Sequence, residues 1–147
     1  ATPLELHYTV MTKNYGDVYT GGTGEWIFQF IVNNNKTEKA TALMLYWMLG
    51  PRGVTETYPL LDTLEMNLIT NFYQETNFGY DPANDHNEYN WTNEYLNNKR
   101  QRKVPEELCM PITGKIISQP DNFESGLPFV FNDKIYELLD QFTIIMD

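Results

Sequence analysis

Hydrophobic and polar residues alternate along the first part of the chain. Residues 4–10 place leucine, tyrosine and valine at every second position, with Glu5, His7 and Thr9 between them. Successive side chains of an extended strand point to opposite faces, so this alternation is typical of a strand with one buried face. Residues 26–32 alternate in the same way, with two largely apolar faces. The pattern predicts strands over 4–10 and 26–32, joined by a glycine-rich loop over 14–24.

The most apolar part of the chain lies within residues 39–49, where no charged residue occurs after Lys39. A strand that is covered on both faces has a continuous apolar sequence. We therefore expect a central, buried strand over 39–49. The following Gly-Pro-Arg-Gly sequence at 50–53 predicts a tight turn, because proline favours the first central position of a turn. Residues 54–58 would then return as the hairpin partner of this strand.

Residues 60–73 fit two patterns. Threonine, isoleucine, phenylalanine and tyrosine nearby favour a strand, whereas Leu61, Leu64 and Leu68 fit the apolar stripe of a helix. We interpret 63–71 as a strand and keep the helix as the alternative.

The second half of the chain shows weaker strand patterns. Gly114 suggests a bend within one of them. The expected elements are a strand at 110–118, a loop at 119–128, a short strand at 129–131, a helical turn at 134–139 and a last strand near 142–146. With about eight strands in all, the sequence predicts an all-β protein, an antiparallel β-sandwich or jelly roll, forming a single domain over residues 1–147.

Residues 73–103 interrupt this pattern. The segment is rich in asparagine, aspartate, glutamate and tyrosine and contains few aliphatic residues. Asp81 followed by Pro82 is a typical start of a short helix. Long polar insertions within a compact domain often carry function. We therefore expect this polar excursion, residues 73–103, to be the functional part of the sandwich.

The charge balance restricts the class of partner. The chain has 10 basic and 20 acidic residues, a net charge of −10 at pH 7. Such a surface repels nucleic-acid backbones and anionic membranes, so neither is expected as a partner. No apolar run is long enough for a membrane-spanning helix, so no membrane insertion is expected. An acidic surface favours a basic protein partner.

Motifs for catalysis are missing from the sequence. Cys109 is the only cysteine, and its neighbours Leu108 and Met110 favour a buried, unreactive thiol. His7 and His86 form no known catalytic or zinc-binding spacing. No nucleophile elbow or phosphate-binding loop occurs. The sequence therefore predicts no catalytic residues and no cofactor, with calcium as the one candidate.

Calcium binding would use loop carboxylates. Calcium takes six to eight oxygen ligands, often from carboxylates and loop carbonyls. Asp17 lies in the glycine-rich loop, and Asp81 and Asp85 lie in the polar excursion. If these loops meet at one end of the sandwich, they form a calcium site. The alternative is that aspartate is simply a common turn residue.

Aromatic residues in the excursion suggest a binding surface. Tyr80, Tyr89, Trp91 and Tyr95 offer ring faces and polar tips, which suit a protein partner or a carbohydrate. The alternative is that these side chains pack the excursion onto the rest of the domain.

These observations favour a non-enzymatic binding or recognition module that acts through loops at one end of a β-sandwich. Three alternatives stay open. They are a structural subunit of a virion or surface assembly, a small β-barrel enzyme with a pocket lined by tyrosine, tryptophan and histidine that uses Glu25 or Asp62, and an acidic inhibitor of a basic partner. Homo-oligomers fit the structural subunit. A recognition role favours an extracellular, surface or virion location, with the cytoplasm left open. The glycosylation sequons at Asn35 and Asn90 arise easily by chance in an asparagine-rich chain.

Overall fold

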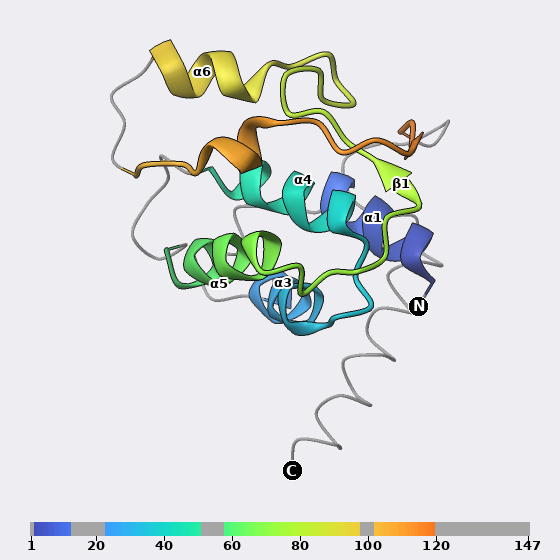
Figure 1. Ribbon diagram of the computed structural model, residues 1–147. Coiled ribbons are helices and arrows are strands. Elements are labelled where there is room, and N and C mark those ends of the chain that lie inside the picture. The colour runs from blue at the N-terminus through green and yellow to red at the C-terminus, as the bar shows by residue number, and fades with distance from the viewer. Residues whose placement is uncertain (1, 13–22, 51–57, 98–101, 120–147) are drawn as a thin grey trace.

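The computed structural model describes residues 2–12, 23–50, 58–97 and 102–119 (Figure 1). Helices dominate this part of the chain, and the few strand residues form a single short pair. The α-helices are α1 (Pro3–Thr12), α3 (Thr23–Asn33), α4 (Lys39–Leu49), α5 (Tyr58–Ile69) and α6 (Trp91–Asn97). The remaining elements are β1 (Phe78–Gly79), the 3-10 helix η2 (Glu106–Cys109) and β2 (Lys115–Ile116).

The prediction of an all-β sandwich or jelly roll is wrong. The strands predicted at 4–10, 26–32 and 39–49 are the helices α1, α3 and α4, and most of the strand predicted at 63–71 is the second half of α5. The described residues contain only β1 and β2, which pair in parallel with Phe78 opposite Lys115 and Gly79 opposite Ile116. The protein is therefore mostly helical where the structure describes it.

A capping box begins α1. The backbone N–H of Thr2 donates to Glu5 Oε1 at 2.9 Å, and the N–H of Glu5 donates to Thr2 Oγ1 at 3.1 Å. This reciprocal arrangement satisfies two N–H groups at a helix start. Pro3, whose fixed φ suits the first helical position, lies between them. Thr-Pro-Leu-Glu is a helix signal in the sequence, and it outweighs the alternation that follows it.

The alternation at 4–10 wrongly predicted a strand because α1 is buried on most of its surface. Leu6 and Val10 belong to the core, but so do the polar residues between them. The Thr9 hydroxyl donates to the Glu5 carbonyl at 2.7 Å, and His7 Nδ1 lies 2.7 Å from Thr41 Oγ1. Because the polar side chains find partners inside the protein, polarity does not mark an outer face here.

Helix α4 is the centre of the fold. Every residue from Ala40 to Trp47 is buried, which explains the continuous apolar run. A helix that is apolar all round lies in the core, as does a strand covered on both faces, so polarity alone cannot separate them. Its 11 residues exceed the usual length of a buried strand and suit a helix.

Helices α3 and α5 show a clear helical stripe. In α5, Leu61, Leu64 and Leu68 are buried, while Met66 and Ile69 are exposed. The helical alternative for this segment is therefore correct. In α3, Ile27 and Phe28 are buried, and so are Ile31 and Val32 four positions later.

The elements form layers around α4 (Figure 1). Helices α1 and α5 pack against α4, α3 packs against α5, and η2 contacts α5. The Trp47 indole Nε1 donates to the Leu108 carbonyl at 2.8 Å and ties η2 to α4. The buried carboxylate of Glu38, just before α4, accepts hydrogen bonds from the backbone of Asn77 and Phe78 and so holds β1.

The strand predicted at 110–118 shortens to β2 and a bridge between Tyr80 and Ile112. Gly114, which the sequence suggested as a bend, lies against β1. A Cβ atom there would come within 2.5 Å of the Phe78 carbonyl carbon. Glycine is thus required at this position because two backbones approach closely.

The polar excursion contains β1 and α6. Asp81 and Pro82 do not begin a helix, contrary to the prediction. Instead α6 begins at Trp91, and the Asn90 side chain caps it by accepting from the N–H of Asn93 at 2.9 Å. Much of the predicted 14–24 loop, the turn after Gly50, the return strand at 54–57 and the elements after residue 119 lie outside the described residues.

Within the described ranges, no helix combines the length and the apolar character needed to cross a membrane.

Candidate ligand pocket

Asp85 organises the loop that joins β1 to α6. Its side chain is buried, and Oδ2 accepts hydrogen bonds from the Tyr80 hydroxyl at 2.5 Å and the Trp91 Nε1 at 3.2 Å. The other oxygen, Oδ1, lies 2.6 Å from His86 Nδ1 and accepts from the N–H of Asn87 at 3.4 Å. A buried carboxylate is stable only when donors surround it in this way.

Backbone hydrogen bonds hold the same loop. The N–H of Asp85 donates to the Tyr89 carbonyl at 2.9 Å, and the N–H of Glu88 donates to the Asp85 carbonyl at 2.7 Å. Glu88 has a φ of 61°, in the left-handed region that side chains rarely adopt. The N–H of Trp91 donates to the Pro82 carbonyl at 2.8 Å and closes the loop. The loop is thus ordered by its own contacts.

These contacts keep Asp85 charged. Burial alone would raise the pKa of the Asp85 carboxyl, because a low-dielectric environment disfavours the charged form. The contact with His86 and the hydrogen bonds from Tyr80 and Trp91 outweigh burial and hold the pKa below its ordinary value. Asp85 therefore carries a negative charge at neutral pH.

His7 of α1 lies on the other side of the same pocket. It is 1% exposed, and its ring meets the edge of Phe78 with centroids 5.3 Å apart. Burial, reinforced by repulsion from His86 and opposed by attraction to Asp85, lowers the pKa of His7 to about 4. Its imidazole is therefore neutral at physiological pH.

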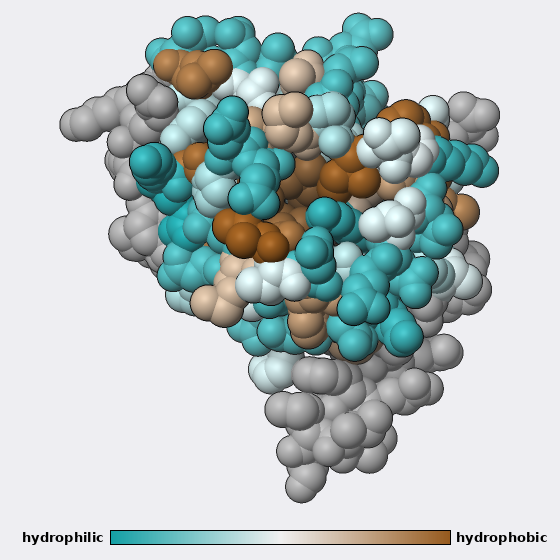
Figure 2. Space-filling view, viewed as in Figure 1, coloured by the Kyte–Doolittle hydropathy of each residue, from teal (hydrophilic) through white to brown (hydrophobic). Residues whose placement is uncertain are grey.

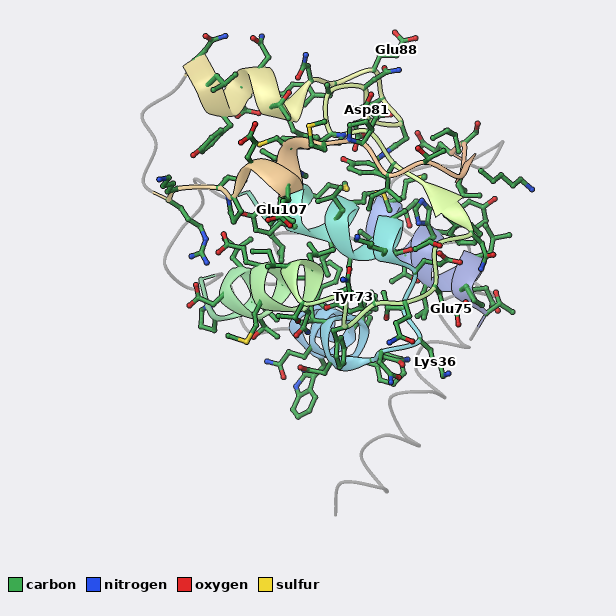
Figure 3. All side chains as sticks on the ribbon, in the orientation of Figure 1. Lys36, Tyr73, Glu75, Asp81, Glu88 and Glu107 are labelled. Carbon is green, nitrogen blue, oxygen red and sulfur yellow. The ribbon has the colours of Figure 1, made fainter. Side chains whose placement is uncertain are left out.

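A pocket of about 230 Å³ lies between α1, α4, this loop and the residues that follow β2. Its carboxylates and imidazoles come from Asp81, Asp85, Glu88, His7 and His86, and its apolar lining includes Met11, Met44 and Ile117. Asp81 and Glu88 both lie on the side of the molecule above α4, well away from Glu75 (Figure 3). The pocket combines three carboxylates with two histidines.

The predicted aromatic binding residues occupy different environments. Tyr80 and Tyr95 are buried, Trp91 is partly buried and Tyr89 is 43% exposed. The rings of Tyr89 and Trp91 are T-shaped with centroids 4.6 Å apart. The Tyr95 hydroxyl donates to the Arg102 carbonyl at 3.1 Å. These two contacts lie within the excursion, and the Tyr95 ring packs it against α4 by meeting the Trp47 ring with centroids 6.1 Å apart. Tyr89 has the largest exposed fraction of the four.

The predicted calcium ligands are only partly brought together. Asp81 and Asp85 line the same pocket, while Asp17 lies outside the described residues. Across those residues, no three histidine, cysteine, aspartate or glutamate side chains are grouped to hold a metal ion. Asp81 Oδ1 accepts from the N–H of Ala83 at 2.9 Å, as a turn aspartate does.

Cys109 lies outside the pocket that His7 and His86 line. Cys109 is partly buried in η2, and burial together with the nearby Glu106 raises the pKa of its thiol. A thiol with a raised pKa is a poor nucleophile. Sequence reasoning assigned no role to the two histidines and missed their common position in the pocket beside Asp85. The adjacency of Asp85 and His86 was the available signal.

Of the two acid–base residues suggested for an enzyme, Asp62 does not line the pocket. Asp62 bonds to Arg102, which also donates from Nε to Glu65 at 2.7 Å. The Glu25 side chain lies outside the described part of the chain.

Searches of protein-family models, curated proteins and solved structures yield no match for this chain.

Proposed function

We propose that this protein is a non-enzymatic recognition module that binds a basic side chain of a partner protein in the Asp85 pocket. The observation that carries the proposal is the lining of the pocket. Three carboxylates line it, from Asp81, Asp85 and Glu88. None of the described residues that line the pocket is a lysine or an arginine. A cationic group would complement this lining.

The size and shape of the pocket support a single side chain as the ligand. Its volume of about 230 Å³ is below the range of roughly 300–1,000 Å³ for drug-sized ligands. Lysine and arginine combine an apolar stem with a charged head. Met11 and Met44 offer apolar surface for the stem, and the carboxylates offer partners for the head.

The net charge of the chain, −10, acts in the same direction. Opposite charges raise association rates by steering the encounter. An acidic inhibitor of a basic partner would use the same chemistry.

The test is a titration with N-acetyl-lysine methylamide and N-acetyl-arginine methylamide, with the glutamine analogue as the uncharged control. We expect the imidazole NMR signals of His7 and His86 to shift with the two cations and not with glutamine. The double variant Asp81→Asn, Glu88→Gln should weaken binding about tenfold, since each of the two lost ion pairs is worth about 0.7 kcal/mol. Glu75→Gln, which removes an exposed charge elsewhere, should bind like the wild type. Equal shifts with all three ligands, or equal binding by both variants, would contradict the proposal.

A second candidate function is general acid–base catalysis in the same pocket. The observation that favours it is the 2.6 Å contact between Asp85 and His86, which resembles the pairing that orients a catalytic base. The test is turnover of p-nitrophenyl acetate and p-nitrophenyl phosphate. Activity in the wild type that disappears in His86→Ala would favour the enzyme over the recognition module.

A further inference from the structure

A second hollow, of about 320 Å³, lies between α4, α5 and η2. We call it the apolar groove, and its apolar lining consists of Leu43, Leu68, Leu108, Met110, Pro111 and Ile112. Figure 2 shows apolar surface recessed at the centre of this face, with hydrophilic residues around it. An exposed apolar surface with a polar rim is typical of an interaction site.

The groove has a firm floor and an adaptable wall. Leu43, Leu68 and Leu108 are buried, whereas Met110 is 57% exposed. The hydrogen bond from Trp47 to the Leu108 carbonyl fixes this part of the floor against α4. A preformed site loses little entropy on binding, and a methionine side chain adapts to the shape of a ligand.

Two opposite charges accompany this apolar surface. Lys39, the first residue of α4, and Glu107 of η2 both line the groove. Glu107 lies close to α4 on the face shown in Figure 3. A ligand that fills the groove therefore meets one cation and one carboxylate. A lipid with an anionic head group matches only Lys39 and is repelled by the net charge of −10.

We infer that the apolar groove binds a short segment of a partner protein that inserts a large apolar side chain. The segment carries an acidic residue that faces Lys39 and a basic residue that faces Glu107. The groove is separate from the Asp85 pocket, so this inference stands or falls independently of the proposed function.

The probe is a random twelve-residue phage-display library selected against the full chain. We expect enriched peptides to share a large apolar residue with one acidic and one basic neighbour. Met110→Glu should weaken their binding by at least about tenfold, because it places a charge against the apolar side chain. Met66→Glu is the matched control, since Met66 is 66% exposed on α5 and is not part of the groove. Circular dichroism melts confirm that both variants fold.

A charge exchange tests the flanking residues. Peptides selected against Glu107→Lys should replace the basic neighbour by an acidic one. The inference is overturned if no peptide is enriched, if Met110→Glu and Met66→Glu affect binding equally, or if the flanking charges do not follow position 107. It is also overturned if light scattering shows a dimer that only Met110→Glu dissociates, because a second copy would then occupy the groove.

Discussion

The hydroxyl of Tyr80 donates a 2.5 Å hydrogen bond to Oδ2 of Asp85, five residues later in the chain. Both side chains are buried, and together they fold the loop that forms one wall of the pocket. The bond links a neutral donor to a charged acceptor in a desolvated place, where such bonds are strongest.

Tyr80→Phe should therefore lower the free energy of unfolding by about 1.5–3 kcal/mol, the usual contribution of a hydrogen bond to a charged group. Tyr89→Phe is the matched control, because Tyr89 is 43% exposed and its hydroxyl bonds to the glutamate of α6 near the surface. It should change stability by less than about 0.5 kcal/mol. Urea denaturation measures both values. Equal effects would mean that the Asp85 contact adds nothing to stability.

The buried His7 should make stability depend on pH. Its folded pKa of about 4 lies below the ordinary value of 6.5, so the unfolded chain takes up the proton more readily. The contribution of the neutral imidazole is complete above pH 6.5 and is lost as the pH falls from 6.5 towards 4. The loss amounts to about 3 kcal/mol.

His7→Gln removes this titration and should flatten the fall in stability between pH 6.5 and 5, measured by urea denaturation at each pH. The variant is compared with the wild type over the same range, because the carboxylates titrate mainly below pH 5. If the free energy of unfolding fell equally with pH in the two proteins, His7 would take up its proton equally in the folded and the unfolded state.

Arg102 contacts two carboxylates of α5 that differ in exposure. The Glu65 side chain is 17% exposed and also accepts from the Tyr46 hydroxyl at 2.6 Å, whereas the Asp62 side chain is 68% exposed. Hydrogen bonding to Glu65 is the main reason that the pKa of Arg102 is raised. Glu65→Gln should lower the free energy of unfolding by about 1.5–3 kcal/mol, the usual contribution of a hydrogen bond to a charged group, because it removes the charge that faces the partly buried guanidinium.

Asp62→Asn, which removes the exposed partner, should lower it by less than about 1 kcal/mol and less still in high salt. Thermal melts at low and high salt compare the two variants. A larger effect of Asp62→Asn would mean that Asp62, and not Glu65, forms the stronger ion pair with Arg102.

The capping box of α1 offers a further test. Thr2→Ala should cost about 1 kcal/mol, since the N–H of Glu5 loses its acceptor. Thr70→Ala is the control, because the exposed Thr70 hydroxyl only bonds back to the Met66 carbonyl in α5. Chemical denaturation should show destabilisation for Thr2→Ala alone.

Helix α4 shows why the fold class was not predictable from polarity. A segment that is buried on all sides has no polar face, so it shows neither the period of a helix nor that of a strand. The length of the segment and the Thr2–Glu5 capping box carried the helical signal instead. Such signals are local and survive burial, whereas alternation reports secondary structure only when one face meets water.

The candidate site was predictable only in part. The concentration of polar and aromatic residues in 73–103 directed attention to the segment that contains the loop around Asp85, where Tyr80 and Asp85 bond to each other. The position of His7 depends on the packing of α1 against α4, and no pattern in the sequence predicts this packing. The pocket arises from that long-range contact.

The hydrogen bond between Trp47 and Leu108 also bears on how the chain folds, since its partners are 61 positions apart. Helices α4 and α5 are neighbours in the sequence, whereas η2 contacts α5 and β2 pairs with β1 across a long stretch of chain. Loop closure loses chain entropy before the contact stabilises it, so we expect such contacts to form late. Substitutions in the segment from Arg102 to Ile117 should mainly speed unfolding, while those in the α4–α5 interface should slow folding. The two walls of the apolar groove would then assemble at different times, with the methionine-bearing wall last.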